Sequence, residues 1–69
     1  MKFSIYGRFQ VEVRREGESW VAYRLGQGLR GRMSDVVVPA EVEAAELAAY
    51  LDDLFHELAE PGDQVVSIQ

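Results

Sequence analysis

Apolar and polar side chains alternate along the start of the chain. Between residues 3 and 13 the apolar ones stand at odd positions: Phe3, Ile5, Phe9, Val11 and Val13. A period of two is typical of a β-strand with one buried face. The pattern predicts one long strand over residues 3–13, bent or bulged at Gly7, because a strand glycine has no side chain to pack.

The alternation resumes after a turn at residues 15–17. A two-residue loop over Glu16 and Gly17 would need a positive φ at Glu16, which glutamate tolerates poorly. A three-residue loop with a left-handed Gly17 avoids this cost and pairs Val11 with Val21, so turn chemistry and hydrophobic matching select the same register. The second strand, residues 19–25, then buries one set of side chains: Val21, Tyr23 and Leu25.

The second half of the chain predicts a single amphipathic helix. Leucines recur there at helical spacing: Leu47, Leu51, Leu54 and Leu58. The helix is expected to begin between residues 39 and 43 and to end near residue 59, because a Pro-Gly pair stops it. Apolar runs at residues 35–38 and 64–69 predict a short strand before the helix and another after it.

These elements define the fold class. We expect one α+β domain over residues 1–69, in which a small antiparallel or mixed sheet of three to four strands carries one helix on one face, in the order ββ(β)αβ. The last strand returns after the helix, so it is expected either parallel beside the first strand or at a sheet edge. With 48% apolar and 28% charged residues, the composition is that of a folded domain.

The residue types exclude several classes of function. Cysteine is absent, which excludes disulfides, a thiolate nucleophile and cysteine-based zinc sites. No apolar run approaches the ~18 residues of a spanning helix, and the first residues lack the apolar core of a signal peptide. We therefore expect a cytoplasmic protein that does not associate with membranes.

Charge is divided unequally along the chain. The net charge is −5, yet all seven Lys and Arg residues lie between Lys2 and Arg32, whereas residues 36–69 carry eight acidic groups and no Lys or Arg. Four acids share one side of the predicted helix with no cation at helical spacing: Glu46, Asp53, Glu57 and Glu60. We interpret this acidic helix stripe either as a solvated surface or as a docking face for a basic protein partner.

The segment GQGLRG, residues 26–31, matches the G-x-G-x-x-G pattern of dinucleotide-binding domains. That fingerprint needs a helix opened by its third glycine, and an acidic residue about 20 positions later on a second parallel strand. A short valine-rich strand follows here instead, so we expect a connection between strands and no nucleotide or other cofactor. The loop region also carries Arg30 and Arg32, candidate phosphate contacts that favour the alternative function of a nucleic-acid-binding accessory domain.

The one histidine offers a metal-site hypothesis that we do not favour. On a helix, Asp52, His56 and Glu60 follow one another at one-turn spacing, and two carboxylates with an imidazole can bind a divalent metal. His56 is expected opposite the leucine stripe, however, on an open surface. We therefore expect an exposed histidine, no metal and, because no nucleophile–base grouping occurs, no catalytic residues.

The predicted register turns Trp20 away from the helix. There it would join Tyr6, Arg8 and Arg24 on the outer sheet face, where an aromatic residue beside arginines is typical of an interface anchor. This face is a candidate surface for a protein partner or for a second copy of the chain. The competing interpretation buries Trp20, because a one-residue slip at the turn would exchange the two faces of the strand.

Two parts of the sequence resemble known families. Residues 36–41 (VVVPAE) and 50–57 (YLDDLFHE) are similar to a family of short bacterial proteins with no assigned function. Residues 16–23 (EGESWVAY) resemble the hairpin of the N-terminal domain of HicB-type antitoxins, which has a partial RNase-H-like fold without catalytic residues. The resemblance implies a non-catalytic protein-interaction domain. Our primary hypothesis is an antitoxin-like protein that offers its acidic helix stripe to a basic partner.

Overall fold

The computed structural model describes residues 1–26 and 28–68; Gln27 and Gln69 lie outside the described residues. Its strands are β1 (Lys2–Ile5), β2 (Phe9–Glu16), β3 (Ser19–Gly26), β4 (Leu29–Arg32) and β5 (Val65–Ser67). The helical segment consists of a 3-10 turn η1 (Ala44–Glu46), the helix α1 (Leu47–Phe55) and a second 3-10 turn η2 (His56–Leu58).

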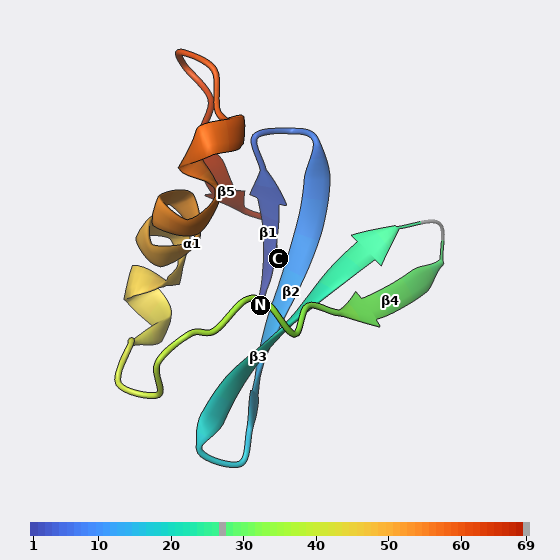
Figure 1. Cartoon of the computed structure of the whole chain (residues 1–69), viewed down its shortest axis with the longest axis vertical. Helices are drawn as coiled ribbons and strands as arrows, with labels where there is room; N and C mark the ends of the chain where they lie inside the picture. The colour runs from blue at the N-terminus through green and yellow to red at the C-terminus, as the bar shows by residue number, and fades with distance from the viewer. Residues whose placement is uncertain (27, 69) are drawn as a thin grey trace.

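The strands form one antiparallel sheet in the order β4-β3-β2-β1-β5, and α1 packs against one of its faces (Figure 1). We call the opposite face the outer sheet face. The predicted α+β class with one helix is confirmed, but the described residues form a sheet of five strands rather than three to four. Of the two placements predicted for the last strand, the one at a sheet edge is found. β5 lies at the edge beside β1 and runs antiparallel to it.

The predicted long first strand is in fact a hairpin. The chain reverses at Tyr6 and Gly7, whose φ angles are 59° and 71°, and the Arg8 N–H donates to the Ile5 carbonyl at 2.9 Å. The three-residue turn pairs Ile5 with Phe9, so odd positions stay on the buried face of both β1 and β2. The alternation of apolar residues is therefore the same for a hairpin as for one long strand, and it does not reveal the extra strand.

The predicted register of the next hairpin is wrong. β2 and β3 are joined by a two-residue turn, Gly17-Glu18, which pairs Glu16 with Ser19. Gly17 has a φ of 66° as the first central residue, as in a type II′ turn, so no glutamate needs a positive φ. Because this loop is one residue shorter than the predicted one, each side chain of β3 points to the opposite face of the sheet from the one predicted. Three of its side chains consequently point to the helix side: Trp20, Ala22 and Arg24.

Of the segment GQGLRG, Gln27 lies outside the described residues, and the residues on either side of it belong to the antiparallel pair β3 and β4. Gly26 pairs with Leu29, and Gly28 has a φ of 78°. β4 is the strand that follows β3 in the chain and pairs with it, whereas residues 35–38 do not join the sheet. Instead the chain crosses the helix side of the sheet after β4 (Figure 1), and Val38 is buried in the core. The predicted strand at 35–38 is therefore corrected to a packed connection.

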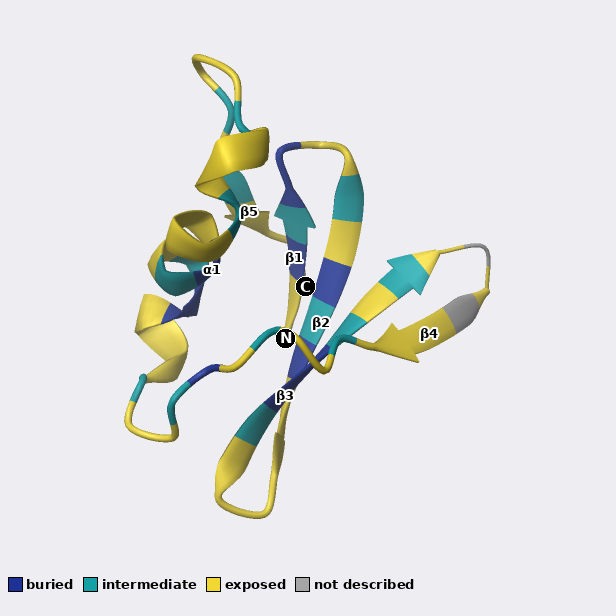
Figure 2. Ribbon diagram, in the orientation of Figure 1, coloured by how far each residue is buried: buried dark blue, intermediate teal, exposed yellow. Residues whose placement is uncertain are grey.

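The helical segment spans residues 44–58, within a residue of the predicted limits at each end. Leu47 and Leu51 are fully buried against the sheet, as predicted. Leu54 and Leu58 are 42% and 45% exposed, so the predicted four-leucine core stripe is wrong at its second half. Figure 2 shows exposed residues along the end of the helical segment. Phe55 points toward the sheet instead of Leu54, and its ring meets Phe9 edge-on with the ring centroids 5.5 Å apart.

Candidate functional site

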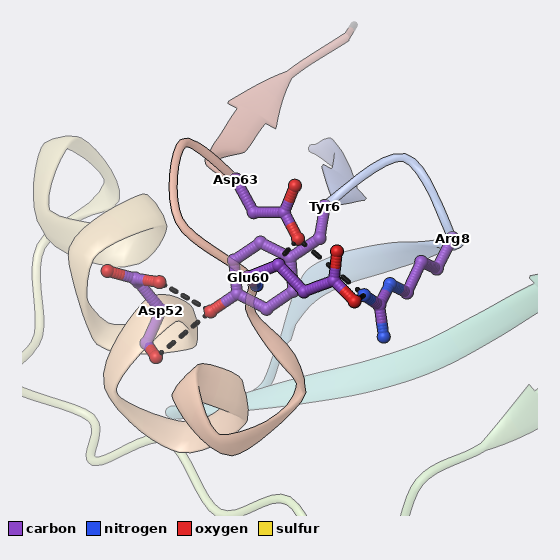
Figure 3. Close-up of polar contacts among 5 residues, drawn as sticks. All are labelled: Tyr6, Arg8, Asp52, Glu60 and Asp63. Atoms are coloured by element: carbon purple, nitrogen blue, oxygen red, sulfur yellow. Dashed lines mark hydrogen bonds and ion pairs between the residues drawn. The ribbon is translucent and has the colours of Figure 1, made fainter.

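Tyr6 joins the β1–β2 turn to the helix (Figure 3). Its ring is buried, and its hydroxyl donates to the Asp52 carboxylate and, at 3.3 Å, to the Asp52 carbonyl oxygen. Burial, together with the hydrogen bond to the Asp52 carboxylate and its negative charge, raises the pKa of Tyr6 to about 12. Tyr6 therefore anchors α1 to the sheet as a neutral phenol.

We expect Tyr6→Phe to change how stability depends on pH. The phenol ionises near pH 10 when unfolded and near pH 12 when folded, so its contribution is complete below pH 10 and is lost as the pH rises to about 12. The melting temperature of the wild type should fall more steeply over this window than that of Tyr6→Phe. Below pH 10 the variant should be less stable by about 1.5 kcal/mol, because it lacks a hydrogen bond to a carboxylate. Melting temperatures that fall in parallel would contradict this role.

Arg8 is held at the end of the helical segment. Its guanidinium lies 3.5 Å from a carboxylate oxygen of Glu60 and 3.7 Å from one of Asp63 (Figure 3). Asp63 also accepts the backbone N–H of Glu60 at 2.9 Å. Exposed pairs of this kind contribute at most about 1 kcal/mol each. They stabilise the turn that leads into β5, and they neutralise one end of the acidic helix stripe.

The four acids of the acidic helix stripe have different roles. Glu46 accepts the backbone N–H of Glu43 at 3.2 Å and so stabilises the start of the helical segment. Glu60 forms an ion pair with Arg8. Asp53 and Glu57 are exposed and form no ion pair with any described residue. Two of the four predicted carboxylates are therefore available to a partner.

Two exposed leucines accompany these two carboxylates. Leu54 and Leu58 follow Asp53 and Glu57 directly in the sequence, and the four residues lie together along the end of α1 and η2 because of their four-residue spacing. We call them the leucine–acid face. The leucine spacing alone assigned both leucines to the core. Phe55 was the available signal against this, since it competes with Leu54 for the buried direction.

The residues predicted for the outer sheet face all lie on the helix side of the sheet: Tyr6, Arg8, Trp20 and Arg24. Trp20 is half-buried, and its indole N–H donates to the Val42 carbonyl at 2.8 Å. Arg24 lies over the ring of Phe9, with its guanidinium carbon 4.4 Å from the ring centroid. For Trp20 and Arg24 the physical reason is the two-residue turn, which exchanges the faces of β3. Tyr6 and Arg8 lie in the β1–β2 turn, which interrupts the strand on which the prediction placed them.

The outer sheet face carries a different set of side chains. The strand register places four exposed cations on it: Lys2, Arg14, Arg30 and Arg32. Arg30 forms an ion pair with Glu12 at 3.1 Å and lies 4.7 Å over the ring of Tyr23. The hydrogen bond from Arg30 lowers the pKa of the Glu12 carboxyl. Both predicted phosphate-contact arginines thus lie on this face, and one of them is already paired.

The three residues of the metal-site hypothesis make separate contacts. Asp52 accepts the Tyr6 hydroxyl, and Glu60 lies beside Arg8. The Nδ1 of His56 donates to the carbonyl oxygen of Asp53 at 2.8 Å. Within the part of the chain that the structure describes, no group of three His, Cys, Asp or Glu side chains is arranged to hold a metal ion.

Fold and surface together define a small α+β domain that presents a leucine–acid face on its helix. The chain belongs to the family described as Domain of unknown function (DUF7661), whose model matches residues 1–69. No curated protein and no solved structure matches the chain. Among the described residues, no helix has the length and apolar character needed to cross a bilayer.

Proposed function

We propose that this domain is a non-catalytic protein-interaction module that binds a basic protein partner through its leucine–acid face. The observation that carries the proposal is the exposure of Leu54 and Leu58 beside two unpaired carboxylates. Exposed apolar side chains that lie together and are rimmed by polar residues are typical of interaction surfaces. The leucines provide apolar area that a partner can bury, and the negative charges of Asp53 and Glu57 favour a partner with a positively charged surface.

The charge of the rest of the chain supports a basic partner. Residues 36–69 carry only acidic charges, and the chain as a whole carries −5. A field of one sign around a docking face speeds the approach of an oppositely charged protein and weakens with added salt. The sequence resemblance to HicB-type antitoxins adds a partner class to the proposal: a small basic toxin, neutralised in the bacterial cytoplasm.

We expect the domain to bind a fluorescein-labelled amphipathic helical peptide made of lysine and leucine. Fluorescence anisotropy should show binding that weakens between about 50 mM and about 500 mM salt, because the charges on both sides are exposed. The Asp53→Asn/Glu57→Gln double variant should bind at least about fivefold more weakly. Leu54→Ser/Leu58→Ser should weaken binding to a similar extent, because it removes the exposed apolar area.

A matched control separates the face from overall charge. Glu18→Gln/Asp35→Asn removes the same number of carboxylates from exposed positions outside the helical segment. This variant should bind the peptide as the wild type does, apart from a small change in salt dependence. Equal weakening in the control and in the helix variants would show that net charge, rather than the leucine–acid face, determines binding.

A second function is favoured by one observation, the cations of the outer sheet face. Arg14 and Arg32 are exposed there on the same face as Lys2, and cations of this kind contact backbone phosphates. A labelled single-stranded oligonucleotide in the same assay tests this alternative. Oligonucleotide binding that is lost in Arg14→Gln/Arg32→Gln and kept in the helix variants would replace the protein-interaction proposal by a nucleic-acid-binding function.

A further inference from the structure

β4 is the outermost strand of the sheet on the side far from the helix. It pairs only with β3, so the backbone N–H and C=O groups along its other edge have no partner strand among the described residues. Figure 1 shows the β3–β4 hairpin extending away from α1, with this edge open. An open strand edge can accept an extended peptide by continuing the hydrogen-bond ladder.

Arg24 stands next to this edge without an acidic partner. Its guanidinium lies over Phe9, which in turn contacts Phe55 edge-on, so the cation is held by a ring rather than by a carboxylate. Arg8 and Arg30, by contrast, each have an ion-pair partner. Among the described residues no carboxylate lies within salt-bridge distance of Arg24. A stacked guanidinium keeps its N–H groups free for a planar anion such as a carboxylate.

At Gly31 no side chain lies between Arg24 and the unpaired edge of β4. Gly31 is the direct cross-strand partner of Arg24 and faces the same side of the sheet. Its φ is not positive, and a Cβ built at this position would meet no atom within 4 Å, so neither backbone conformation nor packing requires glycine. Both residues line an open hollow of about 810 Å³ on the helix side. A glycine inside a strand is typical of places where another chain approaches closely.

We propose that the β4 edge binds an extended acidic peptide of a partner protein as a sixth strand, with a carboxylate opposite Gly31 paired to Arg24. Adjacent strands lie about 4.8 Å apart, so the incoming strand would run roughly 10 Å from β3. Long side chains on both strands span that distance, and at Gly31 no side chain stands between them. This peptide site lies on a different surface from the leucine–acid face and does not depend on the proposed function.

The charges of the hairpin select an acidic partner over a second copy of the chain. Pairing β4 with another β4 would bring Arg30 and Arg32 against their own copies, and like charges on adjacent strands are destabilising. The other sheet edge, residues 64–68, contains no carboxylate that could pair with Arg24. Arg8, which also lines the hollow, is already paired with Glu60 and Asp63.

The test is binding of a labelled peptide of alternating sequence, Thr-Val-Thr-Glu-Thr-Val-Thr, and of its glutamine analogue. Fluorescence anisotropy should show saturable binding of the glutamate peptide, weakened about fivefold in Arg24→Gln and in the glutamine analogue, because a charge-assisted pair is lost. Gly31→Val should weaken binding at least about fivefold by filling the path, while valine, a good strand former, preserves the hairpin. Arg32→Gln removes the same charge from the opposite face of β4 and should change binding by less than about twofold.

Three results would overturn the proposal. The first is no saturable binding of the glutamate peptide to the wild type at about millimolar concentration, the weak limit of specific binding. The second is equal weakening by Arg24→Gln and Arg32→Gln, which would reduce the effect to net charge. The third is unchanged binding in Gly31→Val. Circular dichroism of these same variants shows whether they are folded, and their binding of the lysine–leucine peptide reports separately on the leucine–acid face, which keeps the two proposals separable.

Discussion

Leu51→Ala is expected to destabilise the domain by about 2–5 kcal/mol. Leu51 is fully buried and lies in the core cluster with Phe3, Ile5 and Leu47, so its truncation leaves a cavity between α1 and the sheet. A chain of this length has only about 3–10 kcal/mol of stability in total. Urea titrations followed by circular dichroism should therefore show a large fraction of unfolded protein without denaturant, or a much lower midpoint.

Leu54→Ala provides the matched control, since it truncates the same side chain three positions later on the same helix. Leu54 is 42% exposed, so the expected loss is below about 1 kcal/mol. The difference between the two variants tests where the core ends. Similar midpoints for Leu51→Ala and Leu54→Ala would show that the helix packs as the leucine spacing alone predicts, with all four leucines against the sheet.

Trp20→Ala is expected to cost about 3 kcal/mol, at the lower end of the range for large aromatic residues because the indole is only half-buried. The substitution removes packing against the core and leaves the Val42 carbonyl without the indole N–H. It also removes the ring over which Arg15 lies at 4.3 Å. Trp20→Phe, which keeps an aromatic ring and loses only the donor, should cost about 1 kcal/mol.

Urea midpoints and sedimentation velocity on the same samples distinguish the two roles of this side chain. A core residue lowers the midpoint and leaves the oligomeric state of the folded fraction unchanged. A stable Trp20→Ala that no longer self-associates would instead identify Trp20 as an interface anchor, as the register predicted from the sequence implies.

The fold could be predicted from the sequence where local patterns have one solution. The helical segment follows from the leucine spacing and the flanking Pro-Gly pair, and the final strand follows from the apolar run after that pair. The β1–β2 hairpin could not be predicted, because its three-residue turn leaves the apolar residues of both strands at odd positions, as in one continuous strand. The β2–β3 register depends on whether Gly17 is the last residue of a three-residue turn or the first of a two-residue turn, and both choices allow its positive φ.

The candidate site shows the same division. Asp53 and Glu57 could be placed on an open helix surface because helical spacing alone positions them. That both carboxylates are left without an ion-pair partner among the described residues could not be predicted. It depends on the β1–β2 turn, which brings Arg8 to Glu60 rather than to Asp53 or Glu57. The exposure of Leu54 and Leu58 likewise depends on tertiary packing, in which Phe55 occupies the space beside Phe9.

The central claim is that a basic partner docks on the leucine–acid face rather than on the outer sheet face. Backbone chemical-shift mapping of the labelled protein during titration with the lysine–leucine peptide tests it most directly. We predict that the largest shift changes lie at residues 53–58, and that they disappear in Leu54→Ser/Leu58→Ser. Shift changes concentrated instead on the outer sheet face, in β2 and β3, with the helical segment unaffected, would contradict the claim.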